Sequence, residues 1–178
     1  MLAPVRVLVV GSGAREHALA WALSRSPSLS ELHAAPGNPG VGEVATLHPV
    51  DPLDGEAVAS LAADLGADLV VIGPEAPLVA GVADAVRGRG ISCFGPSREA
   101  AALEGSKAFA KELMEEAGVP TAGHVLLRSR EEALERLANC TYPTVLKADG
   151  LAAGKGVIIC QDEGEARAAV ELFFTEQR

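Results

Sequence analysis

The sequence predicts an α/β protein whose first part is a parallel β-sheet wrapped by helices. Short runs of β-branched apolar residues alternate with helical patterns along this part, which is the order expected of strand–helix–strand units. Glycine-rich turns follow three of the apolar runs. The 178 residues are 48% apolar and can bury a sizeable core, which we expect to consist of Val, Leu, Ile and Ala because aromatic residues are only 3%.

The apolar runs and periodic segments define the expected elements of the first part. The run Val5 to Val10 is rich in β-branched residues, as in a strand that is buried on both faces of a parallel sheet. Loops that follow the strands of such a sheet meet along one edge, where ligands bind. We expect strands at 5–10, 32–35, 69–72 and 91–94, and helices whose apolar faces fall within 19–23, 58–65 and 79–86.

The pattern changes near residue 100, where a second region with its own helix caps begins. The expected caps are Ser106, the pair Ser129 and Glu132, and the pair Asp162 and Glu165. Strands are expected at 125–127, 144–148 and 157–160, the last two as an antiparallel pair. We therefore expect a front domain over 1–103, a connecting helix over 104–121 and a further subdomain over 122–178.

The first glycine-rich segment, Gly11-Ser12-Gly13, lies between an expected strand and helix, where backbone amides and the helix dipole can hold a phosphate. Arg15 can pair with the same phosphate, although Arg15 and Glu16 also suit a solvated helix face. A dinucleotide site would have glycine in place of Glu16 and an acid after the second strand, which ends in His33-Ala34-Ala35-Pro36. The segment therefore suits one phosphate, or is a turn without a ligand.

A second glycine-rich segment, Gly150 to Gly156, joins the two expected antiparallel strands. It differs from the nucleotide-binding P-loop, because three residues instead of four precede Gly154-Lys155 and a glycine follows the lysine. It can act as a lid that places the amides of Gly154 and Gly156 and the charge of Lys155 on a triphosphate. Lys147 supports this interpretation, because an ammonium in an apolar strand needs water or an anion. The alternative is an exposed hairpin with a surface lysine.

Charge and cysteine usage limit the partners and the compartment. The net charge of −9 disfavours nucleic acid and membrane as partners, whereas a small anion can still bind where amides and basic side chains gather. The three cysteines are widely separated, so no disulfide framework is expected. The apolar run at the N-terminus is too short for a signal peptide or a membrane span. We therefore expect a cytoplasmic protein.

Six motifs occur in order along nearly the whole chain. They are GSGAREHAL at 11–19, APGNPG at 35–40, GPEAPL at 73–78, FGPS at 94–97, EGSKAF at 104–109 and LKADGLAAGKGV at 146–157. Each alone is a weak signal. Together, in this order, they resemble the glycinamide ribonucleotide synthetase (phosphoribosylamine–glycine ligase) family of the ATP-grasp superfamily.

The resemblance implies a Rossmann-like substrate-binding domain followed by the first part of an ATP-grasp module, its lid subdomain. It implies a monomer that uses ATP and Mg²⁺ or Mn²⁺ to phosphorylate glycine, whose acyl phosphate the amine of 5-phosphoribosylamine then attacks in a step of purine biosynthesis. By motif, the residues that bind ATP are Lys107, Lys147, Gly154, Lys155 and Gly156. Those that bind phosphoribosylamine are Gly11, Ser12, Gly13, Arg15, Glu16, Gly37, Asn38 and Glu75.

Members of this family are much longer than this chain. The resemblance therefore implies that the catalytic residues, the metal ligands and the glycine site lie outside this segment, and that the segment alone shows no turnover. Three other functions stay open from the sequence: a nicotinamide-dependent oxidoreductase, a different ATP-grasp enzyme with a similar front domain, and a non-catalytic module that senses a nucleotide or sugar phosphate.

Overall fold

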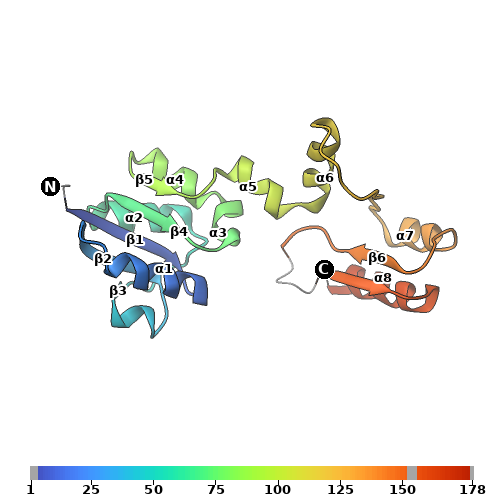
Figure 1. Cartoon of the computed structure of the whole chain (residues 1–178), viewed down its shortest axis with the longest axis horizontal. Coiled ribbons are helices and arrows are strands. Elements are labelled where there is room, and N and C mark those ends of the chain that lie inside the picture. Colours follow the sequence, from blue (N-terminus) through green and yellow to red (C-terminus); the bar gives the residue numbers. More distant parts are fainter. Residues whose placement is uncertain (1–3, 152–155, 177–178) are drawn as a thin grey trace. The chain divides into compact units, whose positions relative to one another are not determined.

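A computed structural model describes residues 4–151 and 156–176, and its contacts divide the chain into two compact units (Figure 1). The front unit is Met1–Gly105 and the second unit is Ser106–Arg178. Each unit has a hydrophobic core of its own. Within the described residues, no helix is both long and apolar enough to cross a membrane.

The front unit is built on a five-stranded sheet in the order β3-β2-β1-β4-β5 (Figure 1). Every neighbouring pair of strands is parallel, which confirms the sheet expected from the sequence. The chain winds outward from β1 in both directions, so β1 and β4 form the point where the strand order reverses. The strands are β1 Val5–Gly11, β2 Leu29–Pro36, β3 Thr46–Leu47, β4 Leu69–Ile72 and β5 Ser92–Phe94.

Helices cover both faces of this sheet. On one face, helices α2 and α4 pack against the aliphatic side chains of β1 and β4, and on the other face α1 and the 3₁₀ helix η1 do so. These cores consist of Val, Leu, Ile and Ala, as the composition predicts. The helices are α1 Ala14–Ser24, η1 Val41–Glu43, α2 Gly55–Asp64, α3 Glu75–Ala80, α4 Val82–Gly88 and α5 Arg98–Gly105.

Strand β3 was not expected from the sequence, and two of the expected elements of the front unit differ from the expectation. Strand β2 begins at Leu29, because the parallel pairing with β1 starts at the pair Val5 and Leu29. The apolar pattern over 79–86 forms two short helices, α3 and α4, instead of one. They are separated at Gly81, whose φ of 93° is a left-handed conformation that glycine adopts without steric cost.

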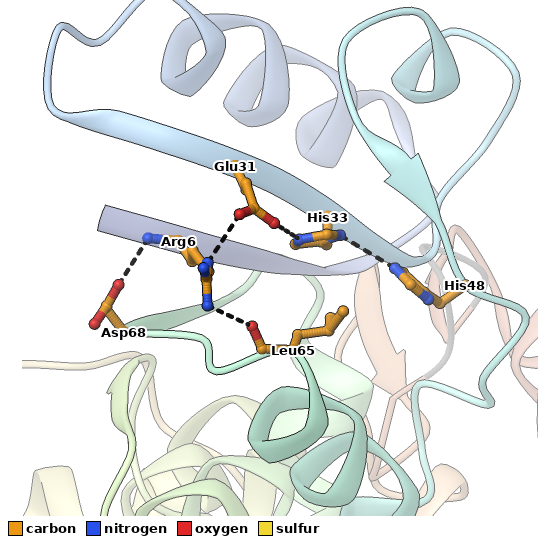
Figure 2. Close-up of polar contacts among 6 residues, drawn as sticks. All are labelled: Arg6, Glu31, His33, His48, Leu65 and Asp68. Carbon is orange, nitrogen blue, oxygen red and sulfur yellow. Dashed lines mark hydrogen bonds and ion pairs between the residues drawn. The ribbon is translucent and has the colours of Figure 1, made fainter. Parts of the chain in front are cut away.

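A chain of polar side chains runs from β1 across β2 to the residue that follows β3 (Figure 2). Arg6 Nε donates to Glu31 Oε1 at 3.0 Å, and Glu31 Oε2 lies 3.4 Å from Nε2 of the buried His33. His48 Nε2 lies 3.2 Å from His33 Nδ1, so one of the two rings donates to the other. Burial, followed by the neighbouring charge of His33, lowers the pKa of His48.

The second unit consists of a two-stranded antiparallel hairpin, β6 and β7, with helices α7 and α8 on one face. The antiparallel pairing confirms the expectation for these strands. Small and aliphatic side chains of α7 and α8 pack around Cys160 to form the core. The elements are α6 Lys107–Glu116, α7 Arg130–Leu137, β6 Thr144–Lys147, β7 Val157–Cys160 and α8 Glu163–Glu176.

The three N-cap side chains expected from the sequence are confirmed, and the strand expected at 125–127 is wrong. Ser106 Oγ and Ser129 Oγ each accept a hydrogen bond from a backbone N–H three residues later, and Asp162 Oδ1 does the same for α8. Residues 125–127 form no strand, and the pairing of β6 with β7 involves no third strand in the described part of the chain. Leu127 packs instead against the core of the second unit.

Candidate substrate and nucleotide sites

The loops that follow β1, β2 and β4 meet at the carboxyl edge of the front sheet. The Gly37 N–H donates to Gly11 O at 3.1 Å, which joins the second loop to the first. The Gly73 N–H donates to Val10 O at 3.1 Å, which joins the third loop to the same strand. The glycine-rich turns that follow β1, β2 and β4 therefore lie side by side, at the position where parallel α/β sheets bind ligands.

Asn38 holds the second loop against the first. Its Nδ2 lies 2.9 Å from Ser12 O and 3.4 Å from Gly13 O, and its Oδ1 accepts from the Val41 N–H at 3.0 Å. Both polar atoms of the Asn38 side chain thus make hydrogen bonds to the backbone. Asn38 positions the glycine segment, and its amide is already occupied before a ligand binds.

Arg15 lies on the rim of the same edge. Its Nη1 donates to Gly73 O at 2.8 Å and lies 3.5 Å from Glu75 Oε2. Its side chain is 65% exposed, so the rest of the guanidinium faces solvent. Because a guanidinium has five N–H donors, Arg15 can hold the third loop and still bind an anion.

Glu16 lies below the loops, and only 3% of the residue is exposed. Its Oε2 accepts a hydrogen bond from the Gly13 N–H at 2.6 Å. A Cβ atom at Gly11 would come within 2.7 Å of Glu16 Cγ, and one at Gly73 would overlap Oε1. Glycine is required at both positions because the Glu16 side chain fills the space between the ends of β1 and β4.

In the second unit, Lys107 and the loop after β6 are held together by Asp149. The Asp149 carboxylate accepts from the Ser106 hydroxyl at 3.0 Å and from the backbone N–H of Lys107 at 2.6 Å, at the N-terminus of α6. Lys107 Nζ donates to Gly150 O at 2.7 Å. Burial raises the pKa of Asp149, but hydrogen bonds from Ala108, Ser106, Gly150 and Lys107 outweigh it and hold that pKa below its ordinary value.

Lys147 ends β6 on the face of the hairpin that α7 and α8 do not cover. Its partner across the hairpin is Val157, and Val145 and Ile159 occupy the next pair on the strands. The apolar side chains on this face are exposed: 47% for Val145, 47% for Val157 and 61% for Ile159. Lys147 therefore lies at the end of an exposed apolar surface. An apolar face with one ammonium at its end suits a flat ring that is joined to phosphates.

The remaining predicted lid residues are only partly visible. Gly156 is buried just before β7, and its carbonyl accepts from the Ala148 N–H at 2.8 Å. Gly154 and Lys155 lie outside the described residues.

The sequence analysis assigned no role to Asp149, although this residue lies within the motif at 146–157. The signal was a carboxylate directly after an apolar strand, but its partner at Ser106 is 43 residues away.

Neither a metal-binding cluster nor a hollow adds residues to these two candidate sites. Across residues 4–151 and 156–176, no group of three or more His, Cys, Asp or Glu side chains could hold a metal ion. An open hollow of about 630 Å³ in the front unit is lined by Val79, Asp84, Ser97, Arg98, Glu99 and Ala102. It includes none of the residues predicted to bind a ligand, so the glycine loops remain the candidate site of this unit.

Solved structures with the same fold define the class of protein. A phosphoribosylamine–glycine ligase from Thermotoga maritima matches 92% of this chain and 38% of its own, with a TM-score of 0.73 and 34% identity. The biotin carboxylase domain of a 2-oxoglutarate carboxylase from Hydrogenobacter thermophilus, solved with MgADP, ADP and bicarbonate, matches 99% of this chain and 42% of its own. Its TM-score is 0.77 and its identity 27%. The fold is therefore that of the front part of an ATP-grasp protein.

The sequence comparisons identify the family. The phosphoribosylglycinamide synthetase N domain matches residues 5–104, and the ATP-grasp (A) domain of the same synthetase matches residues 105–178. The chain therefore belongs to the phosphoribosylglycinamide synthetase family. A phosphoribosylamine–glycine ligase from Streptomyces coelicolor is 61% identical over 92% of this chain. The match covers 39% of that relative, so the chain spans about two fifths of its length.

Proposed function

We propose that the front unit binds 5-phosphoribosylamine and that the second unit supplies part of the ATP site of a phosphoribosylamine–glycine ligase. The complete enzyme would join glycine to the amine and release glycinamide ribonucleotide, ADP and phosphate, as a step of purine biosynthesis. The observation that carries this proposal is the match of two consecutive domains of one synthetase to residues 5–104 and 105–178. The glycine loops fall in the first match and the two lysines in the second.

The proposed amine substrate binds at the edge where the loops after β1, β2 and β4 meet. There Arg15 offers exposed N–H donors, and Asn38 and Glu16 hold the loops in place. Such fixed donors and acceptors orient a small ligand before reaction. The residues assigned to this site are Gly11, Ser12, Gly13, Arg15, Glu16, Gly37, Asn38 and Glu75.

ATP would bind along the open face of the β6–β7 hairpin. Lys147 and Lys107 carry positive charge to this region, and the loop that contains Gly154, Lys155 and Gly156 would close over the phosphates. Positive charge on the phosphate oxygens is the main contribution that a protein makes to phosphoryl transfer. Mg²⁺, when bound, would neutralise further phosphate charge.

The reaction we propose runs in two steps. The glycine carboxylate attacks the γ-phosphorus of ATP, the bond to the β-phosphate oxygen breaks, and ADP leaves with that electron pair. The amine of phosphoribosylamine then attacks the carbonyl carbon of glycyl phosphate, inorganic phosphate leaves, and the nitrogen loses a proton. A closed lid would keep water from the acyl phosphate between these steps.

The test is an assay of ADP release by this chain extended to the length of its relatives. The proposal predicts that release over many turnovers requires both glycine and phosphoribosylamine, and that glycinamide ribonucleotide forms in equal amount. Bicarbonate in place of glycine is the control, because the carboxylase with this fold was solved with that anion. Release that depends on bicarbonate, or on neither substrate, would contradict the proposed reaction.

A further inference from the structure

We propose that Glu16 accepts hydrogen bonds from the hydroxyl or amine groups of the sugar, and that the Gly11–Gly13 segment therefore binds the sugar end of the ligand and not its phosphate. This inference rests on the proposed function, because it assumes a sugar phosphate at the loops after β1, β2 and β4. It revises the expectation from the sequence alone, in which Gly11–Gly13 holds the phosphate.

A carboxylate already occupies the anion position at the start of α1. The Gly13 N–H at the N-terminus of this helix donates to Glu16 Oε2 at 2.6 Å. In a phosphate-binding loop, this amide and the helix dipole would act on a phosphate oxygen. A phosphate at the same place would have to displace a buried negative charge or lie beside it, and both are unfavourable.

The other carboxylate oxygen of Glu16 has a different environment. Glu16 Oε1 makes no hydrogen bond to any residue in the described part of the chain. His33 Nε2 is the one side-chain N or O atom among these residues that is both fully enclosed and without a hydrogen bond, so Glu16 Oε1 is not fully enclosed. Although Glu16 is 97% buried as a residue, its Oε1 is thus an acceptor without a hydrogen bond among the described residues, next to Gly73.

That oxygen lies between two strands of the front sheet. Glu16 Oε1 lies at Gly73, and Glu16 Cγ lies at Gly11, so the side chain fills the gap between the ends of β1 and β4. This gap is where the strand order of the sheet reverses, and ligands of doubly wound sheets bind there. The side chain of Glu75 adds a second carboxylate at the rim, 3.5 Å from Arg15.

These features together favour a ligand group with hydrogen-bond donors next to the Glu16 carboxylate. A buried carboxylate with a free oxygen attracts O–H and N–H groups and repels phosphate. The exposed part of Arg15 is a cationic group that can receive the phosphate at the outer edge of these loops. The sugar would therefore enter with its hydroxyl and amine groups first.

The experiment is calorimetric titration of the 178-residue chain with glycinamide ribonucleotide and, separately, with inorganic phosphate. For Glu16→Gln we expect the Kd of the ribonucleotide to rise roughly tenfold or more, because a hydrogen bond to a charged group is lost, while phosphate affinity stays equal or increases. Glu43→Gln is the matched control, since Glu43 is an exposed glutamate on η1 of the same unit. Unchanged ribonucleotide affinity in Glu16→Gln would overturn the inference, as would an equal loss of phosphate affinity.

A test on the ligand covers the case in which the variant does not fold. With unchanged protein, ribose 5-phosphate should bind roughly tenfold tighter than its 1,2-dideoxy analogue, which keeps the phosphate and lacks two hydroxyls. Equal affinities would overturn the inference while leaving the proposed function intact. If the unchanged protein binds neither glycinamide ribonucleotide nor ribose 5-phosphate, the proposed function fails and the inference fails with it.

Discussion

Several polar side chains at the candidate site make hydrogen bonds to backbone groups of the loops themselves. Asn38 uses its amide on Ser12 and Gly13, and Glu16 uses one oxygen on Gly13. The sequence predicted the glycine-rich turns that follow the strands, because glycines after apolar runs are a local pattern. It did not predict these contacts, because Asn38 lies 26 residues from Ser12 and the contact exists only after β1 and β2 have paired.

The bracing role of Asn38 predicts a loss of stability in Asn38→Ala. The variant leaves the Val41 N–H without its partner, so the free energy of unfolding should fall by about 1 to 2 kcal/mol. Urea unfolding followed by tryptophan fluorescence checks this, because the single tryptophan, Trp21, lies in α1 of the front unit. Asn139→Ala is the control, since Asn139 is exposed and belongs to the second unit. Equal midpoints for Asn38→Ala and the unchanged chain would rule out the bracing role.

At the scale of elements, the sequence predicts those that carry a strong local pattern. The runs 5–10 and 69–72 are strands whose apolar side chains are mostly buried, and 157–160 is a strand that buries one face only. The segment 125–127 has the same composition and is irregular, since a strand also needs a partner strand and the apolar pattern alone does not supply one. Strand β3 was not predicted, because two residues are too short for any pattern.

The histidine pair at the edge of β2 predicts that the front unit loses stability in mild acid. The pKa of His48 is lowered by burial and by His33, so the unfolded chain binds its proton more readily. This contribution to stability is fully present above the unfolded pKa, about 6.5, and is lost as pH falls through the folded pKa. The urea midpoint of Trp21 fluorescence should therefore decrease between pH 7.5 and 5.

Replacing His48 tests the origin of this pH dependence. In His48→Gln the midpoint should change less with pH than in the unchanged chain, because the imidazole whose pKa is lowered in the folded state is gone. His124→Gln, in the second unit, should leave the pH dependence of the Trp21 signal as it was. A pH dependence in His48→Gln as steep as that of the unchanged chain would mean that other groups cause it.

At the scale of the whole molecule, the two units carry different parts of one proposed reaction. Lys147 is predicted to bind the phosphates of ATP, so Lys147→Ala in a chain extended to the length of its relatives should weaken ATP binding. The loss of one charge-assisted hydrogen bond corresponds to a roughly 10- to 100-fold higher Kd, measured by calorimetry. Lys111→Ala is the control, because Lys111 Nζ binds Thr121 and Ala122. The same ATP affinity in Lys147→Ala and Lys111→Ala would remove Lys147 from the site.

The central claim is that the front unit recognises a sugar phosphate and not a dinucleotide. The most direct measurement compares the thermal unfolding of this chain with glycinamide ribonucleotide, a stable substitute for the amine, and with NADH. At a hundredfold excess over its Kd, a ligand stabilises the folded state by about 2.7 kcal/mol, which raises Tm by several degrees. We predict such a shift with the ribonucleotide and none with NADH. A shift with NADH alone would mean that the glycine loops form a dinucleotide site, and would contradict the proposed function.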